Sequence, residues 1–390
     1  MRINSNYTSD ISILLKSAGK ETIFLSSWNK DSDLLDFPLS KAKLYNCLNK
    51  NEINKYFFSD EFFNLKCQII SDNIDFDKNA ISANNFTFVS NGTIAALLCL
   101  LTIFKEKRKI KALLLSPIYY IYINILKDLG GDIFVQPGYN IDLNKISNEI
   151  NAEKINLVIV NNPLFGTGEC ISRKVLASIQ KLLLKNEGFL LIDNIYNGLK
   201  WNEKASKNDF KLFKTLNSYN NFVITESLSK NLYLNGIKHC SIFSNTEYIK
   251  KIEENSVYLC GSITASQYKF IERLYSRNEH QFVIEQLNKN VEYAKKTYNF
   301  ILSILIKSDF FISKCESGGY CLLGIPRKYF DSNDDISIAL EILARTNILT
   351  LPHDRYLFNL KPYYCFRVNL MTERNILFHA LNKLQKSFNA

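Results

Sequence analysis

Lys230 is the residue of this sequence that is best placed for covalent chemistry. It follows two serines, Ser227 and Ser229, and comes soon after the apolar run of residues 222–225. The run predicts a strand, and the polar residues that follow it predict a turn after which the chain doubles back for a short distance. The lysine amine should therefore stand in a cleft beside two hydroxyl groups. Such a lysine can form a Schiff base, and the hydroxyls can bind a phosphate. The alternative is an ordinary solvated lysine, because Lys and Ser are common residues.

A second candidate is Asp193, which ends the apolar run of residues 188–192. We expect this run to be a buried strand, and a carboxylate at its end is costly unless a partner compensates its charge. Tyr196 follows shortly after and can reach the same place. Asp193 therefore indicates a site for a cationic group, and a helix N-cap is its alternative role.

The sequence also contains a candidate anion site. The alternating segment of residues 86–90 predicts a strand, and Gly92, Thr93 and Ile94 then open an apolar helix that runs to about residue 104. Backbone N–H groups at a helix start bind phosphate well, and a glycine allows the anion to approach closely. The alternative is a plain turn between a strand and a helix.

Arg367 lies inside the apolar segment of residues 366–370, which we expect to be a strand. A buried guanidinium needs a carboxylate partner, and its planar fork matches the α-carboxylate of an amino acid. A structural ion pair within the protein is the alternative.

The pattern of elements predicts how these residues are positioned. Strands alternate with helices from about residue 85 to 245, which indicates an α/β fold with a mainly parallel sheet and a site at the strand ends. From about residue 276 the pattern becomes α+β, with one long amphipathic helix over residues 283–305 and a last helix capped by Thr372. A chain of 390 residues is longer than one hydrophobic core usually holds, so we expect more than one domain. We expect residues 1–50 to form an N-terminal arm or a part of the smaller domain, residues 51–275 a large domain, and residues 276–390 the smaller α+β domain.

Taken in order, these segments resemble the pyridoxal-phosphate-dependent aminotransferases of fold type I, class I/II, over nearly the whole chain. The resemblance implies pyridoxal 5'-phosphate as cofactor and a seven-stranded, mainly parallel sheet in the large domain. It implies catalytic roles for Lys230, Asp193 and Tyr196, with Asp193 paired to the pyridine nitrogen. It implies that Arg367 binds the α-carboxylate of the substrate. The other cofactor-binding residues that it implies are Gly92, Thr93, Ile94, Tyr119, Asn162, Ser227, Ser229, Lys238 and Tyr56, the last from a neighbouring subunit.

Three positions depart from the family pattern. Relatives carry an asparagine where this chain has Phe165, so either Asn161 or Asn162 supplies that contact or the contact is absent. An arginine that grips the phosphate in relatives is replaced by Lys238, which offers one charge and no fork. Glu61 stands where a glycine is expected after Tyr56, and for Tyr56 and Tyr119 a packing role is the alternative.

The resemblance implies an aminotransferase that moves an amino group between an amino acid and a 2-oxo acid or another carbonyl compound, in biosynthesis, as a homodimer. A different reaction of the same cofactor, such as elimination, cyclisation or oxidation, is the alternative enzyme activity. A non-catalytic binding protein on the same fold is the third hypothesis. The presence of both Lys230 and Asp193 argues against it.

Composition argues against several other classes of protein. The formal charge of +10 comes from lysines scattered among 38 acidic residues, so we expect no nucleic-acid partner. The nine cysteines show no Cys-x-x-Cys pair, which is typical of a reduced cytoplasmic protein. The four histidines are not paired at helix spacing, which gives a metal site no support. No apolar stretch is long enough to cross a membrane.

Overall fold

The short apolar runs in the first half of the chain form one sheet in the computed structural model. The structure describes residues 7–27, 56–57, 62–72, 81–107, 109–201, 209–358 and 360–388. The sheet has seven strands in the order β2-β8-β7-β6-β5-β3-β4, and β3 to β7 all run parallel. Strand β8 runs opposite to both of its neighbours, β2 and β7. This confirms the predicted α/β fold with a mainly parallel seven-stranded sheet. The strands are β2 (Phe86–Val89), β3 (Lys111–Ser116), β4 (Asp132–Pro137), β5 (Leu157–Asn161), β6 (Phe189–Asp193), β7 (Phe222–Glu226) and β8 (Cys240–Phe243).

Both faces of this sheet are apolar because helices cover both. Successive strand residues point to opposite faces: Leu190 packs in the core under α6, α7 and α9, whereas Leu191 packs in the core under α4, α5 and α11. Such near-continuous apolar strands are typical of a parallel sheet buried on both sides. The helices are α4 (Gly92–Lys107), α5 (Tyr120–Asp128), α6 (Leu143–Glu153), α7 (Arg173–Leu183), α9 (Asp209–Asn217) and α11 (Thr246–Leu259).

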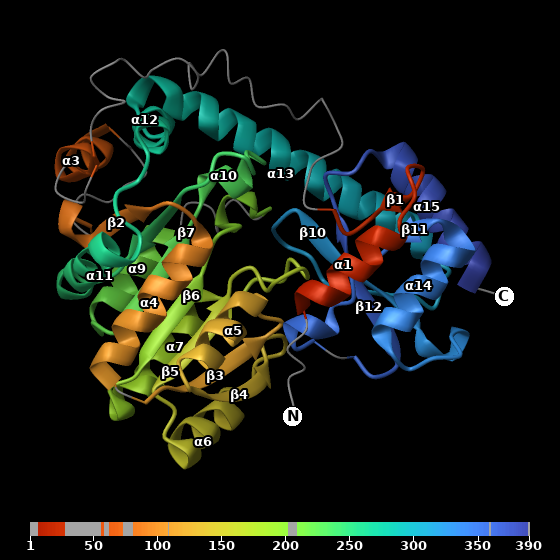
Figure 1. The fold of residues 1–390 in the computed structure, drawn as a ribbon, viewed down its shortest axis with the longest axis horizontal. Coiled ribbons are helices and arrows are strands. Elements are labelled where there is room, and N and C mark those ends of the chain that lie inside the picture. The colour runs from red at the N-terminus through yellow and green to blue at the C-terminus, as the bar shows by residue number, and fades with distance from the viewer. Residues whose placement is uncertain are drawn as a thin grey trace.

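The C-terminal part forms a second core beside the sheet (Figure 1). The long helix α13 (Arg277–Leu305) runs from one part to the other, and α12 (Ala265–Leu274) precedes it. A three-stranded antiparallel sheet in the order β12-β10-β9 carries the second core. Its elements are β9 (Phe311–Ile312), β10 (Tyr320–Pro326), α14 (Asp335–Thr346), β11 (Ile348–Leu349), β12 (Tyr363–Asn369) and α15 (Arg374–Phe388).

The N-terminal segment joins this second core. Helix α1 (Tyr7–Ser17) contributes Leu14 to it, and β1 (Ile23–Phe24) pairs in parallel with β11. Helix α3 (Phe62–Asp72) instead packs near β2, at the edge of the large sheet. The domain boundaries near residues 51 and 276 stay a prediction. None of the helices within the described ranges is long and apolar enough to cross a lipid bilayer.

Two local predictions are wrong. Thr372 does not cap the last helix: α15 begins at Arg374, and the Thr372 hydroxyl has no hydrogen-bond partner among the described residues. Lys230 lies in the short helix α10 (Leu228–Asn231) and not in a plain turn. In that turn of helix the Leu232 N–H donates to the Leu228 carbonyl at 2.9 Å, which fixes the backbone that carries the lysine.

Candidate active site

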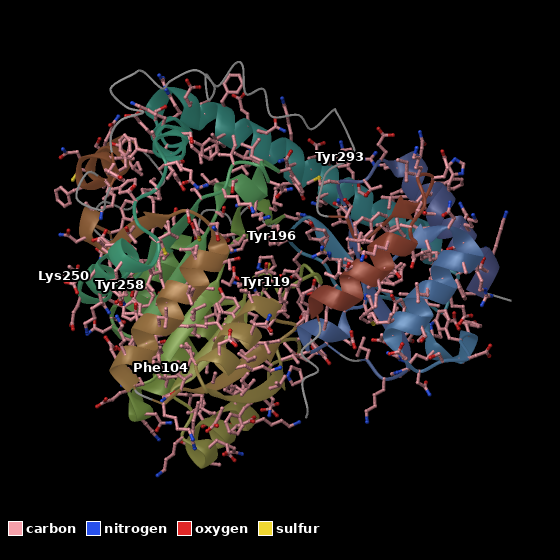
Figure 2. All side chains as sticks on the ribbon, viewed as in Figure 1. Phe104, Tyr119, Tyr196, Lys250, Tyr258 and Tyr293 are labelled. Carbon is pink, nitrogen blue, oxygen red and sulfur yellow. The ribbon has the colours of Figure 1, made fainter. Side chains whose placement is uncertain are left out.

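One cavity of about 500 Å³ lies at the carboxyl ends of the parallel strands. Figure 2 shows Tyr119 and Tyr196 close to each other at the centre of the molecule, between the large sheet and the C-terminal part, and both line this cavity. Most of the predicted site residues line it too: Gly92, Thr93, Ile94, Tyr119, Asp193, Tyr196, Ser227, Ser229, Lys230, Lys238 and Arg367. The structure therefore brings together residues that lie up to 275 positions apart in the chain.

The Lys230 amine is mostly buried, and its Nζ donates a hydrogen bond to Asn235 Oδ1 at 3.0 Å. Burial lowers the pKa of Lys230 below its usual value, and the positive charges of Lys238 and Arg367 lower it further. Each of these causes disfavours the protonated amine. A larger fraction of the amine is therefore neutral and nucleophilic at a given pH. Asn235 was not predicted from the sequence.

Asp193 ends β6 with 4% of its surface exposed. Burial raises the pKa of its carboxyl to about 6, although hydrogen bonds from the Ile195 backbone and from the Tyr122 and Asn161 side chains oppose the rise. The Ile195 N–H donates to Asp193 Oδ1 at 3.3 Å. None of these donors is a cation. The carboxylate is thus buried among neutral donors, which is the environment in which a cationic ligand would lower its energy most.

Asn162, which we predicted to contact the cofactor, does not line the cavity. Its buried side chain accepts a bond from the Ile171 N–H at 2.9 Å and so holds the loop after β5. Asn161 lines the cavity instead, and its Oδ1 accepts a bond from the Tyr119 N–H at 2.8 Å. Asn161 is the last residue of β5 and stands in register with Asp193 on β6. Since neighbouring residues of an extended chain point to opposite sides, only one of the two asparagines can face the site.

The start of α4, which we predicted to be an anion site, borders the cavity. Asn91 caps this helix by accepting a bond from the Ile94 N–H at 3.0 Å. The Ile94 N–H, which we predicted to face a phosphate, is therefore already bonded. The N–H groups of Gly92 and Thr93 precede it and have no acceptor within the helix. A Cβ on Gly92 would lie 2.8 Å from Ile195 Cδ1, so a larger residue at this helix start would have to displace the end of that side chain.

Two serines and a lysine also line the cavity. Ser227 Oγ donates to the His239 carbonyl at 2.7 Å and lies 2.8 Å from Ser229 Oγ, so the two hydroxyls are held together. Lys238 also lines the cavity. Because the Ser227 proton goes to the His239 carbonyl, Ser229 is the donor to Ser227 Oγ in this arrangement. Two helix N–H groups and one ammonium form a set of donors that suits a phosphate.

Arg367 comes from β12 on the other side of the cavity and is 2% exposed. Its Nε and Nη2 donate to the Ser26 carbonyl at 3.3 and 3.2 Å. Its guanidinium carbon also lies 4.7 Å from the centre of the Tyr320 ring. Tyr320 in turn meets the partly buried ring of Tyr196 edge to face, with the ring centres 5.9 Å apart, and desolvation raises the pKa of Tyr196. The guanidinium is therefore held in one orientation beside the cavity.

Tyr56 does not line the cavity, and 72% of its surface is exposed. The next residue, Phe57, forms a β-bridge with Ile263, which places Tyr56 on the outside of the large part. Its predicted role in a neighbouring subunit stays a prediction.

Several lining residues were missed by the sequence reasoning. Tyr120, Phe165 and Tyr356 place aromatic rings in the cavity, and Ile11 reaches it from α1. Tyr120 directly follows the predicted Tyr119, and Phe165 was noted only as a departure, so both carried a signal. Tyr356 and Ile11 carried none, because their approach depends on how the two cores pack.

The sequence pattern of the family described as aminotransferase class I and II matches residues 49–382. An aspartate aminotransferase of Bacillus sp. (strain YM-2) is 23% identical over 256 residues, which cover 64% of this chain and 62% of that protein's length. A histidinol-phosphate aminotransferase of Clostridium kluyveri is 21% identical over 276 residues, 67% of this chain and 73% of that one. The structure of the Thermus thermophilus aspartate aminotransferase with maleate superposes with a TM-score of 0.80 at 15% identity, covering 98% of this chain and 95% of that chain.

Proposed function

The chain belongs to the aminotransferase class I and II family, and we propose that it uses pyridoxal 5'-phosphate to move an amino group between an amino acid and a 2-oxo acid or another carbonyl compound. One observation carries this proposal: the Lys230 amine and the Asp193 carboxylate face the same cavity as an anion site. The amine suits covalent attachment of a carbonyl, the carboxylate suits a cation, and the helix start suits a phosphate. Pyridoxal phosphate carries a carbonyl, a ring nitrogen that can be protonated and a phosphate, so it matches all three protein groups.

The residues at the cavity fit this cofactor. The N–H groups of Gly92 and Thr93 would hold its phosphate together with Lys238. The Ser229 hydroxyl would join them by turning its proton from Ser227 Oγ to the phosphate, while Ser227 stays bonded to the His239 carbonyl. Asp193, whose hydrogen-bond donors are neutral, would pair with the protonated ring nitrogen. Tyr196 would be the donor to its phenolic oxygen, and Tyr119 would stack on its ring. The bound cofactor supplies a carbonyl that condenses with amines and a ring that accepts electrons.

The protein's own groups then act on the amino acid. Arg367 binds the α-carboxylate and so fixes the orientation of the Cα–H bond. Lys230, whose pKa is lowered, takes the proton from Cα as general base. Asp193 stays ionised beside its cationic partner, because the attraction between the two charges offsets the effect of burial on the carboxyl. Carboxylate binding, proton transfer and charge pairing thus come from β12, from the short helix α10 and from the end of β6.

We also propose that the protein acts as a homodimer in the cytoplasm. Tyr56 is exposed at the surface of the large part, where it can meet a second copy. Three large residues at the end of α11 are also exposed: Val257, Tyr258 and Leu259. They are close in sequence to Ile263, which forms the β-bridge with Phe57, the residue after Tyr56. The eight cysteines within the described ranges are free, and five of them are buried, which suits a reducing compartment.

The experiment is to load the purified protein with pyridoxal phosphate and to add amino acids one at a time. Transamination predicts that at least one of them converts the bound cofactor to pyridoxamine phosphate, and that a 2-oxo acid restores it. Products such as ammonia, peroxide or a cyclised compound, without any pyridoxamine phosphate, would instead favour elimination, oxidation or cyclisation.

A further inference from the structure

The charged residues that line the cavity within the described part of the chain leave no partner for a second charge on the substrate. Among the lining residues that the structure describes, Asp193, Lys230, Lys238 and Arg367 are the charged ones. The function proposed above uses the first three for the cofactor and Arg367 for the α-carboxylate. A substrate with a second carboxylate would bury that charge without a cation, which is costly.

Next to Arg367 the cavity is bordered by an aromatic wall, which we define as Tyr119, Tyr120, Phe165 and Tyr356. Phe165 joins the wall to the arginine, since its ring centre lies 5.7 Å from the guanidinium carbon. Ring centres are separated by 4.9 Å for Tyr119 and Tyr120 and by 5.4 Å for Tyr119 and Phe165. They are separated by 4.4 Å for Phe165 and Tyr356. The four rings thus form one continuous apolar surface.

The position of Phe165 in this wall is fixed from behind. The buried His353 stacks on the Phe165 ring with an interplanar angle of 8°, and its Nε2 lies 2.9 Å from the Phe165 carbonyl oxygen. The following Gly166 has a φ of +74°, and a Cβ there would lie 2.3 Å from His353 Cε1. The backbone at Phe165 is therefore held by a glycine and a histidine that fit each other. A wall held in this way loses little freedom when a ligand binds.

On the basis of the function proposed above, we propose that the amino-acid substrate carries an aromatic side chain, which packs on the aromatic wall while Arg367 binds its carboxylate. The rings of the wall meet at interplanar angles of 30°, 47° and 70°, so they present both faces and edges. A further ring can make stacked and edge-to-face contacts with such a surface, which an aliphatic chain cannot make.

The first test uses acids that lack the amino group and therefore cannot react. We would titrate the protein loaded with pyridoxal phosphate with 3-phenylpropanoate, 4-methylpentanoate and succinate, and measure the three Kd values by calorimetry. We expect 3-phenylpropanoate to bind at least about 10-fold more tightly than either of the others, which is the order of discrimination that an apolar pocket achieves. Equal or tighter binding of succinate or 4-methylpentanoate would overturn the inference.

The second test removes one ring of the wall. Phe165→Leu should weaken binding of 3-phenylpropanoate by about 5-fold or more and leave that of succinate unchanged, because only the aromatic contact is lost. The control is Phe300→Leu, which removes a half-buried ring on α13 that does not line the cavity. If Phe165→Leu does not fold, Tyr120→Leu takes its place. An unchanged ratio of the two Kd values in a folded variant would overturn the inference.

These outcomes separate the substrate class from the reaction. If the aromatic acid binds best but no amino acid yields pyridoxamine phosphate, the proposed transfer fails and the ligand class stands. If aspartate or glutamate transfers its amino group readily and the aromatic acid shows no preference, the ligand class fails and the transfer stands.

Discussion

Removing the negative charge of Asp193 should stabilise the protein when no cofactor is bound. Asp193 is 4% exposed, and burial raises the pKa of its carboxyl from 3.8 to about 6. A pKa that is higher in the folded state means that the folded protein holds a proton more tightly than the unfolded chain does. The free energy of unfolding therefore falls as the pH rises from about 4 to about 6, and stays at the lower value above that range.

The size of this loss follows from the two pKa values. The difference between 3.8 and about 6 corresponds to about 3 kcal/mol at neutral pH, since one pKa unit is about 1.4 kcal/mol. Asparagine at position 193 carries no charge and keeps an oxygen for the Ile195 N–H. Its new N–H groups face donors such as the Tyr122 hydroxyl, which offsets part of the gain. We therefore expect Asp193→Asn to raise the free energy of unfolding of the cofactor-free protein by about 1 to 3 kcal/mol at pH 8.

Urea unfolding of the cofactor-free protein and of the variant, at pH 8 and at pH 5, measures this effect. The advantage of the variant should shrink at the lower pH, where the wild-type carboxyl takes up a proton. Asp132→Asn is the matched control, because this carboxylate lies at the surface beside Lys109 and contributes little. Equal or lower stability of Asp193→Asn at pH 8 would refute the idea that the buried carboxylate is held at a cost until a cation binds.

Three further changes test other parts of the site. Arg367→Ala should raise the amino-acid concentration needed for half-maximal reaction by a factor corresponding to about 2 to 4 kcal/mol, with little change in the resting absorption spectrum. If that concentration stays the same, Arg367 does not hold the substrate. Lys238→Arg should slow the loss of pyridoxal phosphate on dialysis, because a guanidinium can grip a phosphate by two bonds; unchanged retention would show that residue 238 points elsewhere. Gly166→Ala should lower the free energy of unfolding by about 1 to 3 kcal/mol, because φ at Gly166 is +74° and His353 leaves no space for a Cβ. The control Gly236→Ala should change this free energy little, because the space around Gly236 is open. Equal effects of the two changes in urea unfolding would argue against the packing of Gly166 on His353.

The sheet and the residues at its strand ends could be predicted because their signals are local. Asp193 closes an unbroken apolar run, and Lys230 follows another, so the pattern of the chain alone indicated that both stand after a strand. The structure places both residues at one cavity. Arg367 was predicted for the same reason, since a charge inside a short apolar strand stands out in a sequence.

Other parts of the site could not be predicted because they depend on single-residue register and on packing between distant segments. The choice between Asn161 and Asn162 turns on which residue ends β5, and a shift by one residue reverses the side that each faces. Ile94 was assigned to a phosphate, but the side chain of Asn91 takes its N–H. Tyr356 reaches Phe165 only because the second core packs against the loop after β5, which no local pattern reveals.

The most direct test of the central claim is to find which lysine carries the cofactor. The protein loaded with pyridoxal phosphate would be reduced with borohydride, digested and mapped by mass spectrometry. The account predicts a pyridoxyl group on Lys230 alone, because that amine is mostly buried, has a lowered pKa and faces the cavity that also holds Asp193. A pyridoxyl group on another lysine, with Lys230 unmodified, would contradict it.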